Sequence, residues 1–273
     1  MNALKTGIIA SGLIFLCFRL SAQADIPVKG KMAFIPAGKY IPMYSSENET
    51  VPVNAFYIDR FPVTNSDFRR FTDQYPEWEK ENVKKLFADQ GYLKHWTGNP
   101  QFELSLAQSP VVNVSWFAAQ KYCECQGKRL PTIAEWEMVA EAGLTRPDGQ
   151  NEAGFNRMIL DLASKPNPTK LPAVGTTQQN YYGVWDMHGL VWEWTYDFNS
   201  ALTTGESRGN ATSDNTLFCG GGSLLAKDVN NYAAFLRFAL RSSLKAKYTV
   251  PNVGFRCVKD AENPDKKTSS KSE

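Results

Sequence analysis

Histidine and cysteine are both scarce in this chain, which has 2 histidines and 5 cysteines among 273 residues. A lone histidine is usually structural, so His95 and His188 are interpreted as packing and loop residues rather than as iron ligands. A long hydrophobic run is also missing, because the apolar stretch from Gly7 to Phe18 is shorter than the ~20 residues that span a bilayer. Neither a histidine-based metal site nor an uncleaved membrane anchor is therefore expected.

The N-terminus has the pattern of a secretory signal peptide. Lys5 precedes the apolar stretch, and Ala22 and Ala24 give the small-x-small pattern that precedes signal peptidase cleavage. We predict that residues 1–24 are removed and that the protein is secreted or periplasmic.

A charge excess of either sign is absent from the remaining chain. Cleavage removes two of the 30 basic residues, Lys5 and Arg19, and none of the 28 acidic ones, which leaves a formally neutral protein. Nucleic acids and anionic membranes both require a basic surface, so neither is expected as a partner. A periplasmic protein or a small molecule remains as the substrate.

Four cysteines remain after cleavage, an even number in an oxidising compartment: Cys123, Cys125, Cys219 and Cys257. Disulfides are then the default expectation. Cys123 and Cys125 lie two apart on a predicted helix and point to different sides, so they are not expected to pair with each other. The other connectivities stay open.

Hydrophobic patterning predicts short strands first and helices next. Residues 25–60 form short strands broken by Pro36, Gly38 and Pro52. Thr132 and Glu135 make a capping box, in which each side chain accepts a hydrogen bond from the other residue's backbone. The predicted helices cover residues 66–75, capped by Thr64 or Asn65, residues 76–94, residues 116–127, capped by Ser115, and residues 132–143.

The C-terminal half has less periodicity. Residues 146–182 are predicted to form an irregular loop region, residues 239–243 a strand end and residues 252–259 a final strand. In residues 183–198, GVWDMHGLVWEWTYDF, the carboxylates of Asp186 and Glu193 lie seven apart across a bend. Together with backbone carbonyls between them they face one point and bind a hard cation, or they form the solvent face of a buried, tryptophan-rich strand. The charged, serine-rich tail at 260–273 is predicted to be disordered.

Seven motifs occur in an order that resembles the formylglycine-generating enzyme family, also called the sulfatase-modifying-factor domain. They are IPAG (35–38), FYIDRFPVTN (56–65), PVVNVSWFAAQKYC (110–123), GKRLPTIAEWE (127–137), GVWDMHGLVWEW (183–194), GGS (221–223) and NVGFRC (252–257). The resemblance implies an α+β fold: a single mixed domain over residues 25–259, C-type-lectin-like, with little regular secondary structure and a calcium-supported core.

The resemblance also implies particular ligands. Asp186 and Glu193 would bind calcium through their side chains, and Gly189 and Val191 through backbone carbonyls. Asp186 stands where the family has asparagine, which keeps an oxygen ligand and adds charge.

The family's structural disulfide corresponds to Cys123–Cys257. Cys125 and Cys219 are then left to form a second bridge, the alternative being that one of them is a free thiol.

The family's copper chemistry requires two cysteine thiolates shortly after the GGS motif. The corresponding positions here are Ala226 and Asn231, or Asp228 and Ala233 when the alignment is anchored on residues 239–242. No cysteine lies between Cys219 and Cys257 in either case. Copper binding and formylglycine formation are therefore not expected.

Two hypotheses about function follow. The chain is an oxidoreductase or maturation factor acting on a periplasmic substrate, or it is a non-catalytic binding module on the same scaffold. The candidate catalytic or binding residues are Ser223, Lys227, Asp228, Tyr232 and Arg241.

Overall fold

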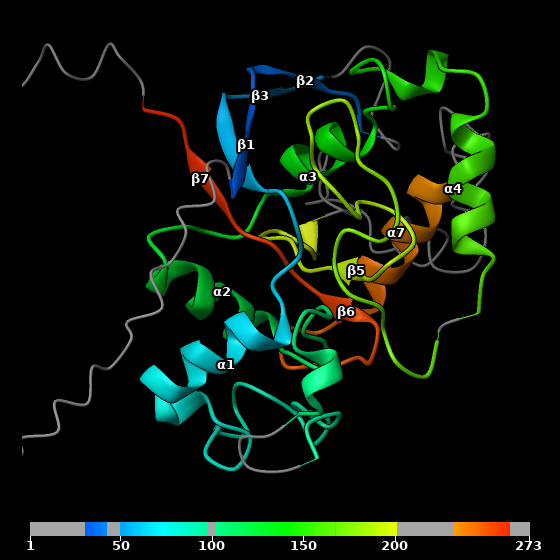
Figure 1. The fold of residues 1–273 in the computed structure, drawn as a ribbon. Helices are drawn as coiled ribbons and strands as arrows, with labels where there is room; N and C mark the ends of the chain where they lie inside the picture. Colours follow the sequence, from blue (N-terminus) through cyan, green and yellow to red (C-terminus); the bar gives the residue numbers. More distant parts are fainter. Residues whose placement is uncertain (1–30, 43–49, 98–101, 167, 201–231, 263–273) are drawn as a thin grey trace, which may run out of the picture.

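The fold has two small antiparallel sheets, and the first of them brings the two ends of the described chain together (Figure 1). The structure is a computed structural model and describes residues 31–42, 50–97, 102–166, 168–200 and 232–262. In the first sheet β4 (Phe56–Asp59) lies between β1 (Met32–Ile35) and β7 (Val258–Asp260). In the second, β2 (Gly38–Tyr40) pairs with β3 (Val51–Val53). Short N-terminal strands are confirmed, and Pro36, which has no N–H to continue a ladder, lies between β1 and β2. The predicted breaks at Gly38 and Pro52 are wrong: Gly38 is the first residue of β2, and Pro52 lies inside β3, an edge strand in which proline is tolerated.

Three helices begin at the capping residues that the sequence predicts. They are α1 (Asn65–Gln74), α2 (Trp116–Cys125) and α3 (Ile133–Ala140). Thr64 forms a capping box with Asp67, and Thr132 forms one with Glu135, while the Ser115 side chain accepts from the Ala118 N–H. None of the helices in the described ranges is long and apolar enough to span a membrane.

The helix predicted over residues 76–94 is wrong. Only the 3₁₀ turn η1 (Pro76–Trp78) forms, and turns follow it. The reason is tertiary: the Asp89 N–H donates to the Lys247 carbonyl, and the Leu93 N–H to the Asn113 carbonyl. These N–H groups pair with distant loops instead of with carbonyls four residues back.

Two further helices correct the prediction for the C-terminal half. Helix α4 (Phe155–Ala163) lies within the region predicted to be irregular, and Phe155, Ile159 and Leu162 have the i, i+4, i+7 spacing of one helical face. Helix α7 (Tyr232–Ser243) contains residues 239–243, which the sequence placed at a strand end. These two helices pack against each other (Figure 1).

The remaining elements are very short. They are η2 (Leu104–Leu106), η3 (Gly149–Asn151), and the parallel pair β5 (Trp192–Glu193) and β6 (Val253–Gly254). The final strand is therefore interrupted, since residues 255–257 separate β6 from β7. A mixed α/β domain with little regular structure is confirmed. The predicted signal peptide at 1–24 and residues 263–273 of the predicted tail lie outside the described residues, although Asp260 belongs to β7.

Two apolar clusters form the core. In one, Phe68 of α1 stacks on Tyr122 of α2 with 5.8 Å between ring centroids and meets Phe255 edge-on at 6.1 Å. In the other, the inward residues of the first sheet, including Ile35 and Ile58, pack on α3. The Trp136 side chain of α3 belongs to this second cluster and also contacts Glu193 of β5, where the candidate site lies.

Candidate functional site

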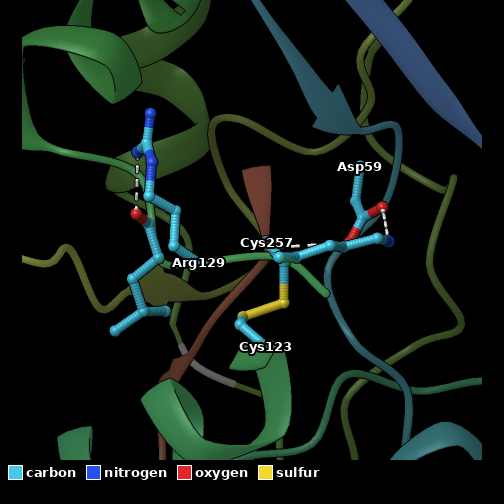
Figure 2. The surroundings of a disulfide bond; sticks show 6 residues. Asp59, Cys123, Arg129 and Cys257 are labelled. Atoms are coloured by element: carbon cyan, nitrogen blue, oxygen red, sulfur yellow. Dashed lines mark hydrogen bonds and ion pairs between the residues drawn. A yellow bond between two sulfur atoms is a disulfide. The ribbon is translucent and has the colours of Figure 1, made fainter. Parts of the chain in front are cut away.

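One disulfide fixes the C-terminal segment to α2 (Figure 2). Cys123 and Cys257 are bonded, with 5.6 Å between their Cα atoms and 134 residues between them in sequence. Asp59 holds the same residue from β4, because its N–H donates to the Cys257 carbonyl at 2.9 Å and its carboxylate accepts from the Cys257 N–H at 3.3 Å. This pairing is the one that the family resemblance implies.

The predicted Cys125–Cys219 bridge is not formed at Cys125, which carries a free thiol. Cys125 is at the last position of α2, beside the Tyr75 hydroxyl, and hydrogen bonding to this thiol raises the pKa of Tyr75. Cys219 lies outside the described residues.

The carboxylate of Glu193 is held in a fully buried ion pair with Arg256. Both side chains have 0% exposure, and the guanidinium donates from Nε to Oε2 at 2.7 Å and from Nη2 to Oε1 at 2.8 Å. Trp136 Nε1 also donates to Oε2 at 2.8 Å. The other N–H groups of Arg256 donate to the backbone carbonyls of Asp59, Arg60 and Trp185. The pair is fully hydrogen-bonded, which is the condition under which buried charges are tolerated.

The side chains predicted to bind calcium are both hydrogen-bonded within the protein. Both Glu193 oxygens accept from N–H donors, whereas a calcium ion would require six to eight oxygen ligands in all. Asp186 accepts from the Gly175 N–H, from the Thr177 N–H at 3.0 Å and from the Thr177 hydroxyl at 2.8 Å. No group of three or more acidic, histidine or cysteine side chains in the described ranges could hold a metal. Hydrogen bonds and an ion pair fasten this stretch, and calcium binding by Asp186, Gly189, Val191 and Glu193 stays a prediction.

Gly189 has a packing role in this stretch. Its φ is +83°, and a Cβ built on it would lie 2.9 Å from the Leu162 Cβ of α4. Any side chain would therefore be strained in conformation and would press on α4. Val191 is buried on the same side of the domain with Val112 and Leu190.

A second buried ionic cluster joins α3 to α7. Glu137 accepts from Arg237 Nη2 at 2.7 Å and from Arg241 Nη1 at 2.5 Å. The two guanidinium carbons lie 5.4 Å and 5.0 Å from the centroid of the Trp136 ring. Burial would raise the pKa of Glu137, but the two arginines outweigh burial and hold this pKa at about 2. Trp136 thus touches both ionic clusters, with its ring on one and its N–H on the other.

A cleft of about 640 Å³ opens beside this cluster. Its walls come from α4, from residues 187–192 and from α7. Three prolines that follow α4 in the sequence, Pro166, Pro168 and Pro172, also line it. The residues that line the cleft include Trp136, Ile159, Leu162, Lys165, Trp192 and Arg237.

Two titratable groups near the cleft have shifted pKa values. Burial, with a contribution from Arg237, lowers the pKa of His188 to about 4, so its ring is neutral at pH 7. His188 Nε2 lies 2.8 Å from the Ala140 carbonyl, which makes Nε2 the protonated nitrogen. Burial and the nearby Glu137 carboxylate raise the pKa of Glu141 to about 7.

Most of the predicted catalytic residues lie outside the described part of the chain. Ser223, Lys227 and Asp228 fall there, and Tyr232 is described only as the first residue of α7. Arg241 is 6% exposed and bound to Glu137, so its placement is that of a structural ion pair. His95 also packs as expected: its Nε2 lies 2.8 Å from the Asn65 side-chain oxygen.

The sequence interpretation missed the partners that organise this region. Glu137 and Arg256 were not singled out, although each belongs to a motif that carried the family resemblance. The wall supplied by α4 was also missed, and the spacing of Phe155, Ile159 and Leu162 was the available signal.

Fold and site together define a mixed α/β domain held by a disulfide and two buried ionic clusters. Residues 19–261 match the model of the sulfatase-modifying factor enzyme 1-like domain. The chain therefore belongs to that family.

A relative named as an enzyme and one named as inactive match this chain at similar levels of identity. The formylglycine-generating enzyme of Mus musculus is 28% identical, over 84% of this chain and 75% of its own. The inactive C-alpha-formylglycine-generating enzyme 2 of Bos taurus is 29% identical, over 78% of this chain and 80% of its own.

Among solved structures, Treponema denticola variable protein 1 has a TM-score of 0.50 at 18% identity, over 84% of this chain and 95% of its own. That similarity shows the fold alone.

Proposed function

We propose that this protein is a maturation factor of the sulfatase-modifying-factor family that acts on a secreted or periplasmic protein or small molecule without copper–dithiol chemistry. One observation carries the proposal. After Cys219 the chain contains only Cys257, and that sulfur is bonded to Cys123. No pair of thiolates is left in the C-terminal region to hold Cu(I), a soft ion that requires sulfur ligands.

The proposed compartment is supported by two independent features. The first 24 residues have the signal-peptide pattern, and a disulfide across 134 residues is stable in an oxidising environment. An anionic polymer is not proposed as the partner, because the chain without residues 1–24 has equal numbers of acidic and basic residues.

A non-catalytic binding module is the second candidate, and the placement of Arg241 favours it. This is the one catalytic candidate whose side chain is described, and Glu137 occupies it in a buried pair. A binding role on this scaffold would need only the cleft and the fixed surface around it.

A deletion strain distinguishes the two candidates. A maturation factor predicts that one secreted protein or metabolite accumulates with a changed covalent mass, measured by mass spectrometry of the extracytoplasmic fraction. A binding module changes the amount or the location of its partner and leaves the mass unaltered.

Complementation provides the controls. The full-length gene should restore the wild-type mass, and a version lacking residues 2–24 should not, because its product stays in the cytoplasm. If the version lacking residues 2–24 also restored the wild-type mass, that result would contradict the proposed compartment.

The absence of copper chemistry is tested separately. The purified protein is incubated with Cu(I), oxygen and a peptide containing a sulfatase-type cysteine motif. We expect no conversion of the cysteine to an aldehyde, and aldehyde formation would overturn the proposed mechanism class.

A further inference from the structure

We propose that the cleft between α4 and α7 is a binding site for a small aromatic or apolar molecule that carries one carboxylate. This inference does not depend on the maturation role, because it concerns a ligand whose binding is measured on the purified protein alone.

The size and walls of the cleft set the body of the ligand. Its volume of about 640 Å³ lies within the ~300–1,000 Å³ typical of small-molecule sites. Ile159 and Leu162 line it from α4, and Trp136 and Trp192 contribute aromatic rings. Flat aromatic ligands gain the most from such walls, because they bury a large apolar area without losing much conformational freedom.

The guanidinium group of Arg237 favours a ligand with a negative charge. Arg237 lines the cleft and is 5% exposed, and its Nε and Nη2 donate to Glu137. No hydrogen bond from Nη1 to a described residue is formed. Arg237 is therefore the guanidinium group that a ligand in the cleft would meet.

The charge balance around Arg237 favours an anion. Glu137 offers one negative charge to two buried guanidinium groups, which leaves one positive charge in excess. Glu141 compensates only in part near pH 7, because burial raises its pKa to about 7. The neutral His188 ring adds no charge to the wall. A carboxylate on Nη1 would complete the cluster through a charge-assisted hydrogen bond, and Lys165 on the cleft wall supplements its attraction.

A pair of matched probes tests the inference by isothermal titration calorimetry. 2-Naphthoate supplies the aromatic body and the carboxylate, and 2-naphthamide has the same shape without the charge. We expect saturable one-to-one binding of 2-naphthoate and at least about tenfold weaker binding of 2-naphthamide, because hydrogen bonds to charged groups contribute that much.

Two variants locate the binding. Leu162→Trp fills the cleft from the α4 wall and should abolish naphthoate binding. If that variant does not fold by circular dichroism, Ala163→Trp obstructs the same wall from an exposed position. Lys165→Ala should weaken binding severalfold, and Lys39→Ala, an exposed lysine on β2, is the matched control that should leave it unchanged.

Three outcomes would overturn the inference. They are no saturable binding of 2-naphthoate at millimolar concentration, equal affinity for 2-naphthamide, and undiminished binding to the folded cleft-filling variant. None of these outcomes would bear on the deletion-strain result, so failure here is distinguishable from failure of the maturation role.

Discussion

Substituting Glu193 should be among the most destabilising single changes in the described structure. Neither Glu193 nor Arg256 is exposed, and in Glu193→Ala the guanidinium stays buried while it loses both carboxylate oxygens that accept its hydrogen bonds. The Trp136 N–H loses its acceptor as well. Breaking a buried pair by removing one partner costs about 3–5 kcal/mol.

That free-energy loss converts into a large change in melting temperature. For a domain of this size about 1 kcal/mol shifts Tm by ~2–4 °C, so Glu193→Ala should lower Tm by roughly 6–20 °C. The assay is thermal unfolding followed by circular dichroism. Glu103→Ala is the control, because Glu103 pairs with Lys170 on the surface with 48% side-chain exposure. Exposed pairs contribute about 0–1 kcal/mol, so the control should change Tm by no more than ~4 °C.

A double-mutant cycle then separates the pair from the individual side chains. Glu193→Ala with Arg256→Met should cost much less than the sum of the single changes, because the second substitution removes the stranded charge. Additive costs would mean that the two residues do not act as a pair.

Calcium provides the result that would refute this reasoning. If Glu193 acts only as the ion-pair partner of Arg256, the Tm of the wild-type protein should be the same with calcium and with a chelator. A Tm that rises with calcium in the wild type and not in Glu193→Ala would establish Glu193 as a calcium ligand.

Three other predictions concern acidity and sulfur. The raised pKa of Glu141 means that its ionisation lowers stability as pH rises from 4.5 to about 7, in surroundings that include Glu137, Arg237, Asp148 and Tyr40. Glu141→Gln should therefore raise Tm at pH 8 and leave it nearly unchanged at pH 4.5; an equal shift at both values would contradict the assignment. Replacing both disulfide cysteines by alanine should cost about 2–5 kcal/mol in urea unfolding, and no loss of stability would show that the bond does not constrain the chain. Thiol titration of the denatured, unreduced protein lacking residues 1–24 should find two thiols. A result of no free thiols would mean that Cys125 and Cys219 form the second disulfide after all.

Local signals explain which helices the sequence predicts correctly. Thr64, Ser115 and Thr132 each cap a helix through contacts within three residues, so the pattern is complete in the sequence itself. The 76–94 segment has similar apolar spacing, but two of its backbone N–H groups, those of Asp89 and Leu93, donate to the carbonyls of Lys247 and Asn113, which are distant in sequence. Apolar spacing along the sequence does not show that these distant carbonyls compete with helical hydrogen bonds.

The sequence by itself determined the family, the short strands, the capped helices and the missing thiolate pair, because each depends on residue identity or on neighbours along the chain. The tertiary structure alone decided which groups the acidic residues contact. The sequence predicts that Glu193 and Asp186 bind one cation, and folding brings Arg256 from 63 residues away onto Glu193 and the 175–177 backbone onto Asp186. A buried carboxylate takes whichever positive or N–H partner the fold delivers, and that choice depends on contacts that are remote in sequence.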